Sequence, residues 1–469
     1  MEILHISAEC YPIAKVGGLA DVVGALPKYQ SNSTISSQVI MPLYNNKFTK
    51  ENTFETVYET KLTIGGKVSI YRILTLKNKD IGFNIFFVDI PELLFNDFVY
   101  SNDDTDRFLA FQIAVLDWIM TLNEKPTIVH CHDHHTGLIP FMMTQCKKFK
   151  ILRSIPTVLT IHNAQYQGWF SHNKVSLIPE FNIESVGVID WDGSVNPLAA
   201  AIKCAWKVTT VSPSYMEELK LNANGLEHLL SHESAKCVGV LNGIDAEVWN
   251  PETDNYLVGN YSVSNVQSGR KMNKKWLCKE FNLDFEKPLF AFIGRLVGEK
   301  GADLLPEVFK YALEKEKISI LLLGSGHDEV EEQLNDLIDA FSGSYNAFIG
   351  YDERLSHIIY GGADFLLMPS RVEPCGLNQM YALKYGSVPI VRSIGGLKDT
   401  IIDINEEEGF GICHDEVTVH EITNAMERGV ALYQDQSKFR KIRKKMMGID
   451  HSWNASALEY IDIYKSLKN

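Results

Sequence analysis

Short apolar runs alternate along this chain with amphipathic segments, and loops of small residues separate the two. In the first half the pattern starts at Ile3–Ser7, where an apolar run leads through a glycine loop into a helical segment ending near Leu26. It recurs at six later apolar runs: Thr127–His130, Lys207–Ser212, Leu289–Ile293, Ile318–Leu323, Phe365–Pro369 and Val388–Val391. Strands that alternate with helices in this way predict parallel sheets covered by helices on both faces.

A polar, turn-rich stretch at residues 242–265 separates two such series. We therefore predict an α/β fold of two doubly wound domains facing across a cleft, residues 1–241 and 242–450. A last helix lies within residues 451–469, and the pattern does not say where it packs. The segment Phe48–Val88 alternates apolar and polar residues, which predicts an antiparallel insertion without helices on the first sheet. Ligands of doubly wound sheets bind at the carboxyl ends of strands, beside helix N-termini.

Composition narrows the class of protein. The 469 residues are 45% hydrophobic and 22% charged, which is typical of a globular protein. Eight scattered cysteines without a C-x-x-C pair favour a reducing cytoplasm over a disulfide framework or a metal site. No basic leader and no apolar stretch of about 18 residues is found, so we expect no membrane segment. A net charge of −14 argues against nucleic acid as a partner, although local cations can still bind a phosphorylated small molecule.

Two glycine loops carry such local cations. Lys15 precedes Gly17 and Gly18, whose backbone N–H groups can approach a ligand at the start of a helix. Arg295 and Lys300 surround a second glycine-rich turn that follows an apolar strand. An arginine fork and a lysine point charge at a helix N-terminus suit a diphosphate. Glycine turns with solvated surface charges remain the alternative for both loops.

A third loop combines a carboxylate with backbone donors. Glu373 lies on a tight Pro/Gly loop that opens a helix, and the N–H groups of Cys375–Leu377 follow it. The carboxylate can accept hydrogen bonds from sugar hydroxyls, and capping of the helix by an acid is the alternative. Gly395 and Gly396 repeat the strand–glycine–helix arrangement and are candidates to supply further amides to a phosphate.

A histidine-rich segment, His130–His135, precedes a second segment, Thr160–Asn163. Strand alternation puts His130 and His132 on one face and Asp133 at the strand end. The segment is similar to a hydrolase metal signature, but its aspartate falls one place early. A polar pocket wall or core histidines therefore fit it better than a metal site.

Together and in this order, these segments resemble the bacterial glycogen synthases and plastid starch synthases, glycosyltransferase family five, of the GT-B fold. The resemblance covers essentially the whole chain. It is carried by E-C-Y-P-I-A-K-V-G-G-L-A-D near the start, H-C-H-D at 130, T-I-H-N-A-Q-Y-Q-G at 160, L-N-G-I-D at 241, G-R-L-V-G-E-K-G at 294, E-P-C-G-L-N-Q-M-Y-A-L-K-Y-G at 373, and G-G-L-K-D-T at 395.

The resemblance implies transfer of glucose from ADP-glucose to the non-reducing end of an α-1,4-glucan with retention of configuration, without a cofactor or metal. The catalytic residues it implies are His162, Arg295, Lys300, Glu373 and Asp133. The substrate-binding residues it implies are Lys15, Gly17, Gly18, Asp21, Asn163, Asn242, Cys375, Gly376, Leu377, Gly395 and Gly396. A metal-dependent hydrolase that uses His130–His135 and a non-catalytic glucan-binding protein are the alternatives.

The chain departs from the family pattern at three positions. His134 stands where the family has tryptophan, and Ile394 stands where it has threonine. Tyr381 replaces the second glutamate of the wider superfamily, which family five itself often lacks. The first two departures change an aromatic contact near a sugar and remove a hydroxyl beside a phosphate loop.

Overall fold

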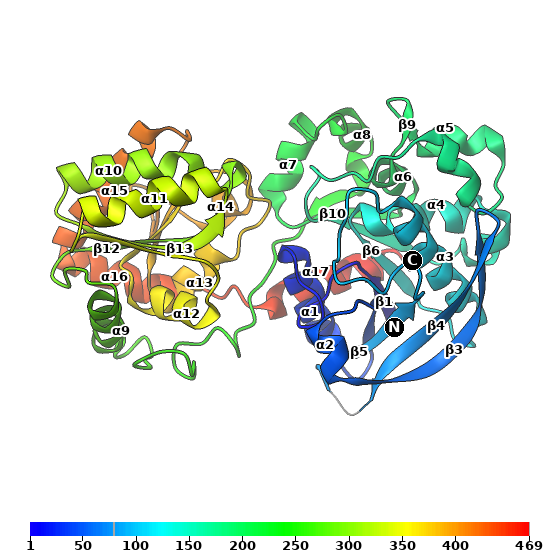
Figure 1. The fold of residues 1–469 in the computed structure, drawn as a ribbon, viewed down its shortest axis with the longest axis horizontal. Helices are drawn as coiled ribbons and strands as arrows, with labels where there is room; N and C mark the ends of the chain where they lie inside the picture. The colour runs from blue at the N-terminus through cyan, green and yellow to red at the C-terminus, as the bar shows by residue number, and fades with distance from the viewer. Residues whose placement is uncertain (78–79, 469) are drawn as a thin grey trace. The chain divides into compact units, whose positions relative to one another are not determined.

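The computed structural model describes residues 1–77 and 80–468, and its contacts divide the chain into two units. Unit 1 is formed by Met1–Val240 and the segment that starts at Trp453. Unit 2 is formed by Leu241–Ser452. In each unit, helices lie on both faces of a central sheet (Figure 1). The predicted α/β fold with two doubly wound units is therefore confirmed.

Unit 1 contains a nine-stranded sheet in the order β11-β10-β7-β6-β1-β2-β5-β4-β3. The first seven strands of that order are parallel, and β3 and β4 add an antiparallel hairpin at one edge. Their bounds are β1 (Glu2–Ile6), β2 (Ser36–Pro42), β3 (Thr53–Ile64), β4 (Lys67–Lys77), β5 (Asn84–Asp89), β6 (Ile128–His132), β7 (Thr157–Ile161), β10 (Lys207–Thr210) and β11 (Cys237–Gly239). The main helices are α1 (Gly18–Gln30), α3 (Thr105–Thr121), α4 (Leu138–Gln145), α6 (Pro197–Cys204), α7 (Pro213–Leu221) and α8 (Glu227–His232).

The antiparallel insertion is present, but the prediction that it has no helix is wrong. A short helix, α2 (Lys47–Glu51), precedes β3. The side chain of Asn46 caps it by accepting a hydrogen bond from the N–H of Thr49, and Phe48 is buried in the core. A five-residue helix is too short to show a helical period, so the strand-like alternation that follows it hides it.

Unit 2 contains a parallel six-stranded sheet in the order β14-β13-β12-β15-β16-β17. Its strands are β12 (Leu289–Leu296), β13 (Ser319–Gly326), β14 (Tyr345–Ile349), β15 (Phe365–Met368), β16 (Val388–Arg392) and β17 (Ile412–His414). Its helices are α9 (Val266–Glu280), α10 (Leu305–Lys315), α11 (Asp328–Ala340), α12 (Glu353–Gly362), α13 (Asn378–Tyr385), α14 (Gly395–Thr400), α15 (Val419–Gln434) and α16 (Gln436–Met447).

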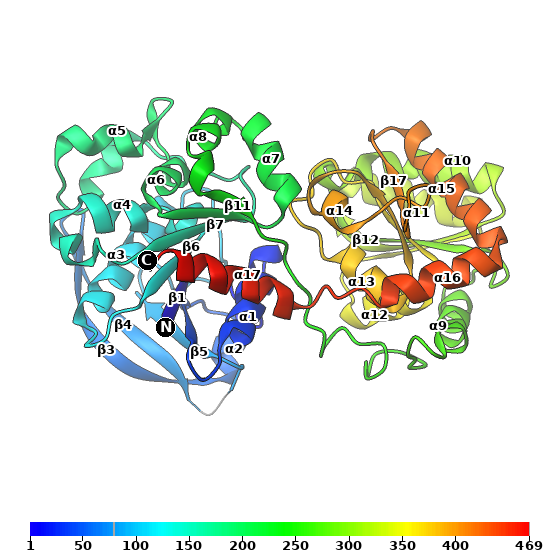
Figure 2. The ribbon, with the colours of Figure 1, turned by 180° about the vertical axis from the view of Figure 1, so that it is seen from behind.

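The last helix, α17 (Trp453–Ser466), belongs to unit 1 although all of unit 2 precedes it in the chain. It lies beside α1, as Figure 2 shows, and contacts it directly. Its buried residues Trp453, Tyr460 and Tyr464 share a hydrophobic core with Ile3 of β1 and Leu26 of α1. The position that the sequence left open is thus set by an apolar face that matches the one on α1.

Each sheet has a point at which the order of its strands reverses. In unit 1 the chain leaves β1 toward β2 and returns on the other side at β6, and in unit 2 it leaves β12 toward β13 and returns at β15. Ligands of doubly wound sheets bind beside such points, at the carboxyl ends of the strands. We call the loops after β1, β6 and β7 the unit 1 half-site, and the loops after β12, β15 and β16 the unit 2 half-site.

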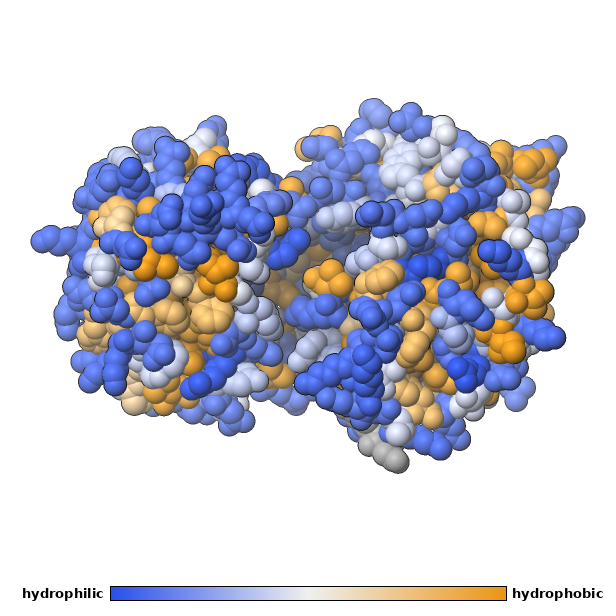
Figure 3. Space-filling view, viewed as in Figure 1, coloured by the Kyte–Doolittle hydropathy of each residue, from blue (hydrophilic) through white to orange (hydrophobic). Residues whose placement is uncertain are grey.

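On the face shown in Figure 3, hydrophobic residues lie singly or in small groups among hydrophilic ones. No helix among the described residues is both long and apolar enough to cross a membrane.

Candidate functional site

The loop after β1 is held by a buried carboxylate, Glu9, which was not among the predicted site residues. Glu9 Oε2 accepts the N–H groups of Val16 (2.5 Å) and Gly17 (2.9 Å), and its Oε1 accepts the hydroxyl of Tyr100 (2.5 Å). The expectation that the N–H of Gly17 faces a ligand is therefore not met, because Glu9 occupies it. An added Cβ at Gly17 or Gly18 would meet no atom within 4 Å, so the outer side of the loop is open.

Lys15 projects from this loop and lies next to Asp21 of α1. Its Nζ is 2.7 Å from Asp21 Oδ1, and 45% of its side chain is exposed. An ion pair this open contributes little to stability. Lys15 is therefore available to exchange its partner for an anionic ligand.

Asp133 fixes the loop after β7. It follows β6 with a φ of 55°, a left-handed conformation that is uncommon for residues other than glycine. Its Oδ1 accepts the backbone N–H of His162 at 2.7 Å, and its own N–H donates to the carbonyl of Thr160. Burial raises the pKa of Asp133 to about 7, although the N–H groups of His162 and Asn163 act against that shift. The predicted catalytic aspartate is thus a residue that positions His162 and Asn163.

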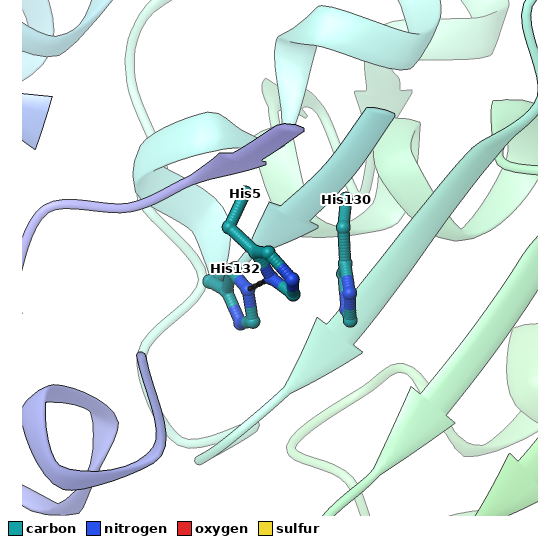
Figure 4. Close-up of side chains that lie close together, drawn as sticks. All are labelled: His5, His130 and His132. Atoms are coloured by element: carbon teal, nitrogen blue, oxygen red, sulfur yellow. Dashed lines mark hydrogen bonds between the residues drawn. The ribbon is translucent and has the colours of Figure 1, made fainter. Parts of the chain in front are cut away.

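His162 ends a row of buried histidines. His5 on β1 and His132 on β6 are joined by a hydrogen bond of 3.0 Å, with His130 beside them (Figure 4). His132 Nδ1 lies 2.9 Å from His162 Nε2. Strand register brings the row together, because His5 is paired with His130 and His132 with Thr160. Burial lowers the pKa of every one of these four imidazoles.

The predicted alternative of a metal site on His130–His135 does not match this geometry. His134 and His135 form a separate ring pair with centroids 3.7 Å apart. Within the part of the chain that the structure describes, three potential ligands converge only at His5, His130 and His132. All six of their ring nitrogens are in hydrogen bonds, with Gln30, Tyr464, Thr160, His162 and each other. These bonds satisfy the rings without an ion.

In the unit 2 half-site, Lys300 and Glu373, which were predicted to contact different parts of a ligand, are bonded to each other. Lys300 Nζ lies 2.6 Å from Glu373 Oε2, which also accepts the hydroxyl of Ser370 at 2.9 Å. The Glu373 side chain is 7% exposed and that of Lys300 is 26% exposed, so the pair lies at the edge of the core. Arg295 is far more open: its side chain is 62% exposed and it contacts Glu299 at 3.2 Å.

The glycines of the unit 2 half-site allow close backbone packing. A Cβ on Gly395 would collide with the carbonyl oxygen of Glu373, and one on Gly396 with that of Cys375. The N–H of Gly396 donates to the Glu373 carbonyl at 3.2 Å, so it is not available to a phosphate as predicted. The glycine pair instead holds the Glu373 loop against α14.

Cys375 and its neighbours complete the loop. The Cys375 thiol is buried, and burial raises its pKa to about 12. Asn242 donates its backbone N–H toward this thiol, and its buried Oδ1 has no hydrogen-bond partner among the described residues. Gly376 has a φ of 73° before Leu377 caps α13.

The departures from the family pattern have local partners. Tyr381 stacks on Trp249 with ring centroids 3.7 Å apart. His134 packs on Gly168, where a Cβ would collide with the imidazole. Ile394 packs against the unit 2 core.

Several residues that lie in or behind the two half-sites were not predicted from the sequence. These are Glu9, Tyr100, Ser370, His5, Gln30 and Tyr464. Glu9 stands in the first motif of the chain and could have been found there, since a buried acid beside a glycine loop must accept hydrogen bonds from nearby donors. The others carry no local signal.

Comparisons with known proteins agree with this arrangement. Residues 2–232 match the starch synthase catalytic domain family, and residues 276–446 match the glycosyl transferases group 1 family. A glycogen synthase of Flavobacterium johnsoniae is 51% identical over 467 residues, covering 99% of this chain and 98% of its own. One of Anoxybacillus flavithermus is 35% identical, covering 100% and 98%.

Solved structures agree as well. The catalytic domain of starch synthase IV from Arabidopsis thaliana, bound to ADP and acarbose, has a TM-score of 0.90 and 31% identity, covering 100% of this chain and 99% of that one. A sucrose-phosphate synthase from Thermosynechococcus elongatus has a TM-score of 0.63 at 16% identity and shows the shared fold alone.

The two doubly wound units, with the candidate residues at the strand ends, and the whole-chain similarities define a glycosyltransferase of the GT-B class. Within that class, the chain belongs to the glycogen synthase and starch synthase family. A glycosyltransferase enzyme is thereby favoured over the metal-dependent hydrolase.

Proposed function

We propose that this enzyme transfers glucose from ADP-glucose to the non-reducing end of an α-1,4-glucan and retains the anomeric configuration. The observation that carries the proposal is the whole-chain similarity to a starch synthase structure that binds ADP and acarbose. ADP is the product that an ADP-glucose donor leaves behind.

The local charges support an anionic donor. The chain has a net charge of −14, yet Lys15, Arg295 and Lys300 lie beside the strand ends of the two half-sites. Cations placed where a leaving diphosphate gains charge stabilise the transition state, and removing one such group costs roughly 3–4 kcal/mol. We propose that both units supply groups to this one reaction.

The carboxylates support a reaction without a covalent glucosyl-enzyme. Retaining hydrolases place a free carboxylate about 5 Å from a second one. Here Asp133 accepts backbone N–H groups, and Glu373 is bonded to Lys300 and Ser370. With both carboxylates engaged, a front-face reaction, in which the leaving phosphate helps to deprotonate the acceptor hydroxyl, is the better hypothesis. We propose that the reaction requires no metal.

The test is an assay of glycogen with ADP-glucose and with UDP-glucose, reporting the nucleoside diphosphate that is released. We expect ADP release that continues in the presence of a chelator, and an α-linkage in the product by NMR. Preference for UDP-glucose would overturn the proposed donor, and a trapped glucosyl-enzyme would overturn the front-face reaction.

We also propose a cytoplasmic location. The eight cysteines are all free thiols in the structure, and five of them are buried, as expected for a protein kept in a reducing compartment. Fractionation of cells that express the protein tests this, and recovery from a secreted fraction would contradict it.

A further inference from the structure

We propose that Tyr464, Gln30 and His5 are positioning residues for His162. A directed chain of hydrogen bonds holds His162 as the tautomer with its hydrogen on Nε2 and a lone pair on Nδ1. The role of that lone pair rests on the proposed function, which puts His162 next to the transferred sugar. The tautomer itself can be measured without any assay of activity.

The direction of this chain of hydrogen bonds is set at a backbone carbonyl oxygen, which can only accept a hydrogen bond. Thr209 donates its hydroxyl hydrogen to the carbonyl of Leu159 at 3.2 Å. Its oxygen lies 2.6 Å from the hydroxyl of Thr160, so Thr160 must be the donor between the two. The hydrogen of Thr160 is then used, and the oxygen of Thr160 must accept from His130 Nε2 at 2.6 Å.

The same donor-to-acceptor direction continues from His130 to Tyr464 on α17. Burial lowers the pKa of His130 well below its usual value, so the ring is neutral and its Nδ1 must accept. The donor is the hydroxyl of Tyr464 at 2.7 Å, whose oxygen in turn accepts the Nε2 of Gln30 at 3.1 Å. The amide oxygen of Gln30 is left to face His5 Nε2 and the hydroxyl of Ser37, each at 2.8 Å, and both donate to it.

The remaining steps run along the histidine row. His5 donates from Nε2, so its Nδ1 accepts from His132 Nε2 at 3.0 Å. His132 Nδ1 then accepts from His162 Nε2 at 2.9 Å. Burial lowers the pKa of His5 to about 4 and that of His162 to about 3, so both rings are neutral near pH 7. His162 therefore has no hydrogen on Nδ1.

This arrangement decides what His162 can do. Its Nδ1 has no hydrogen-bond partner among the described residues and is not one of the buried unpaired atoms, so it reaches the surface of unit 1. A bare Nδ1 accepts the hydrogen of a sugar hydroxyl and cannot donate one to a leaving oxygen. Because the hydrogen-bond chain ends on the Leu159 carbonyl, it orients the His162 ring and does not conduct a proton.

Thr209 offers a matched pair of variants. Thr209→Val keeps the shape of the side chain but removes its hydroxyl. The hydrogen bond to the Leu159 carbonyl is then lost, and the other hydrogen bonds can reverse their donors and acceptors. Thr209→Ser keeps the hydroxyl and removes a methyl group, so the direction should persist. If both directions become equally populated in Thr209→Val, kcat falls about twofold, and further if the reversed direction dominates.

Tyr464→Phe removes the hydroxyl that links His130 to Gln30 in the hydrogen-bond chain, and Tyr460→Phe is the control. Tyr460 is a fully buried tyrosine one turn earlier on α17, and its hydroxyl is not part of the chain described above. We expect a mixture of His162 tautomers in Tyr464→Phe and a single tautomer in Tyr460→Phe.

The readout is the ¹⁵N shift of each ring nitrogen of His162 in protein labelled at histidine, because protonated and bare nitrogens differ clearly. We expect a hydrogen on Nε2 in the unaltered protein and in Thr209→Ser, and mixed tautomers in Thr209→Val and Tyr464→Phe. A hydrogen on Nδ1 in the unaltered protein, or one unchanged tautomer in all variants, would overturn the proposal.

Kinetics separates this proposal from the proposed function. If the tautomer mixes while kcat is unchanged, the chain exists but the assignment of His162 to the reaction fails. If the loss of kcat follows the melting temperature, with Thr209→Ser at least as impaired as Thr209→Val, the role of Thr209 is structural and the positioning proposal fails.

Discussion

Arg295 and Lys300 differ in what surrounds them, although both were predicted from one glycine loop. Arg295 is mostly exposed, whereas Lys300 neutralises the buried carboxylate of Glu373. Removing Lys300 therefore disturbs both the charge at the site and the fold around Glu373, since a buried carboxylate without its partner is costly. A substitution at Arg295 therefore tests catalysis with less effect on stability than one at Lys300.

We expect Arg295→Ala to lower kcat about 10²–10³-fold, because a cation that stabilises the leaving diphosphate is lost. Its free energy of unfolding should change by less than about 0.5 kcal/mol, since its ion pair with Glu299 is open to solvent. Steady-state kinetics and urea unfolding check both parts. Arg440→Ala, an exposed arginine on α16, is the control, and a loss of kcat below tenfold in Arg295→Ala would remove Arg295 from the catalytic set.

Gly395 packs closely against the backbone of the Glu373 loop. Gly395→Ala adds a methyl group against the Glu373 carbonyl at a φ of 47°, so we expect it to destabilise the protein by about 1–3 kcal/mol. Gly187→Ala, inside α5 (Val186–Ile189), meets no atom within 4 Å and should be neutral or slightly stabilising. Chemical denaturation measures the free energy of unfolding of both variants. Equal values for Gly395→Ala and Gly187→Ala would refute the packing role of Gly395.

At the scale of elements, α17 completes a core that the rest of unit 1 leaves open. It brings Trp453, Ala457, Tyr460, Ile461 and Tyr464 into that core. At roughly 1.5–3 kcal/mol for each large apolar side chain, this burial is comparable with the whole stability of a domain.

A chain truncated after Ser452 should therefore lose unit 1 and keep unit 2. Limited proteolysis followed by mass spectrometry should recover a protected fragment close to Leu241–Ser452, with residues 1–240 degraded. The full chain, treated in the same way, is the control. Survival of unit 1 in the truncated chain would show that α17 is dispensable to its fold.

Helices and strands could be predicted best where only one face of a helix is buried, or where a short apolar run marks a strand between helices. Strands β1, β6, β12 and β15 are found where their apolar runs predicted them. Helix α3 was not assigned, because twelve of its seventeen residues are buried and this leaves little polar periodicity to detect.

The candidate site could be predicted only in part for a similar reason. Lys15, Arg295, Lys300 and Glu373 stand in loops whose composition reveals them. Tyr464 acts through Gln30, 434 positions away in the chain, and Tyr100 through Glu9, 91 positions away. Such contacts are created by strand order and helix packing, which local patterns do not encode.

At the scale of the whole molecule, buried neutral histidines make stability depend on pH. The folded pKa values of His5, His130, His132 and His162 lie below the usual 6.5, so the unfolded chain binds more protons below that pH. The free energy of unfolding therefore falls as pH falls from about 6.5 toward 4. For His5 and His162, whose pKa values fall to about 4 and about 3, the loss at pH 5 is about 2 kcal/mol each.

We expect unit 1 to lose protection against hydrogen exchange more steeply than unit 2 between pH 7 and pH 5. Among the described residues of unit 2, His414 and His451 have lowered pKa values, so its loss should be smaller. Exchange measured at both pH values by mass spectrometry, corrected for intrinsic rates, checks this. Parallel losses in both units would contradict it.

The return of α17 to unit 1 has a consequence for synthesis on the ribosome. Unit 2 emerges as one continuous segment and can fold as soon as Ser452 has left the exit tunnel. Unit 1 begins to emerge first, yet its core stays incomplete until α17 follows, and the contact between Ile3 and α17 closes a loop of more than 400 residues. The nascent chain thus carries an apolar surface around β1 and α1 for most of its translation, which makes this half the natural client of a chaperone.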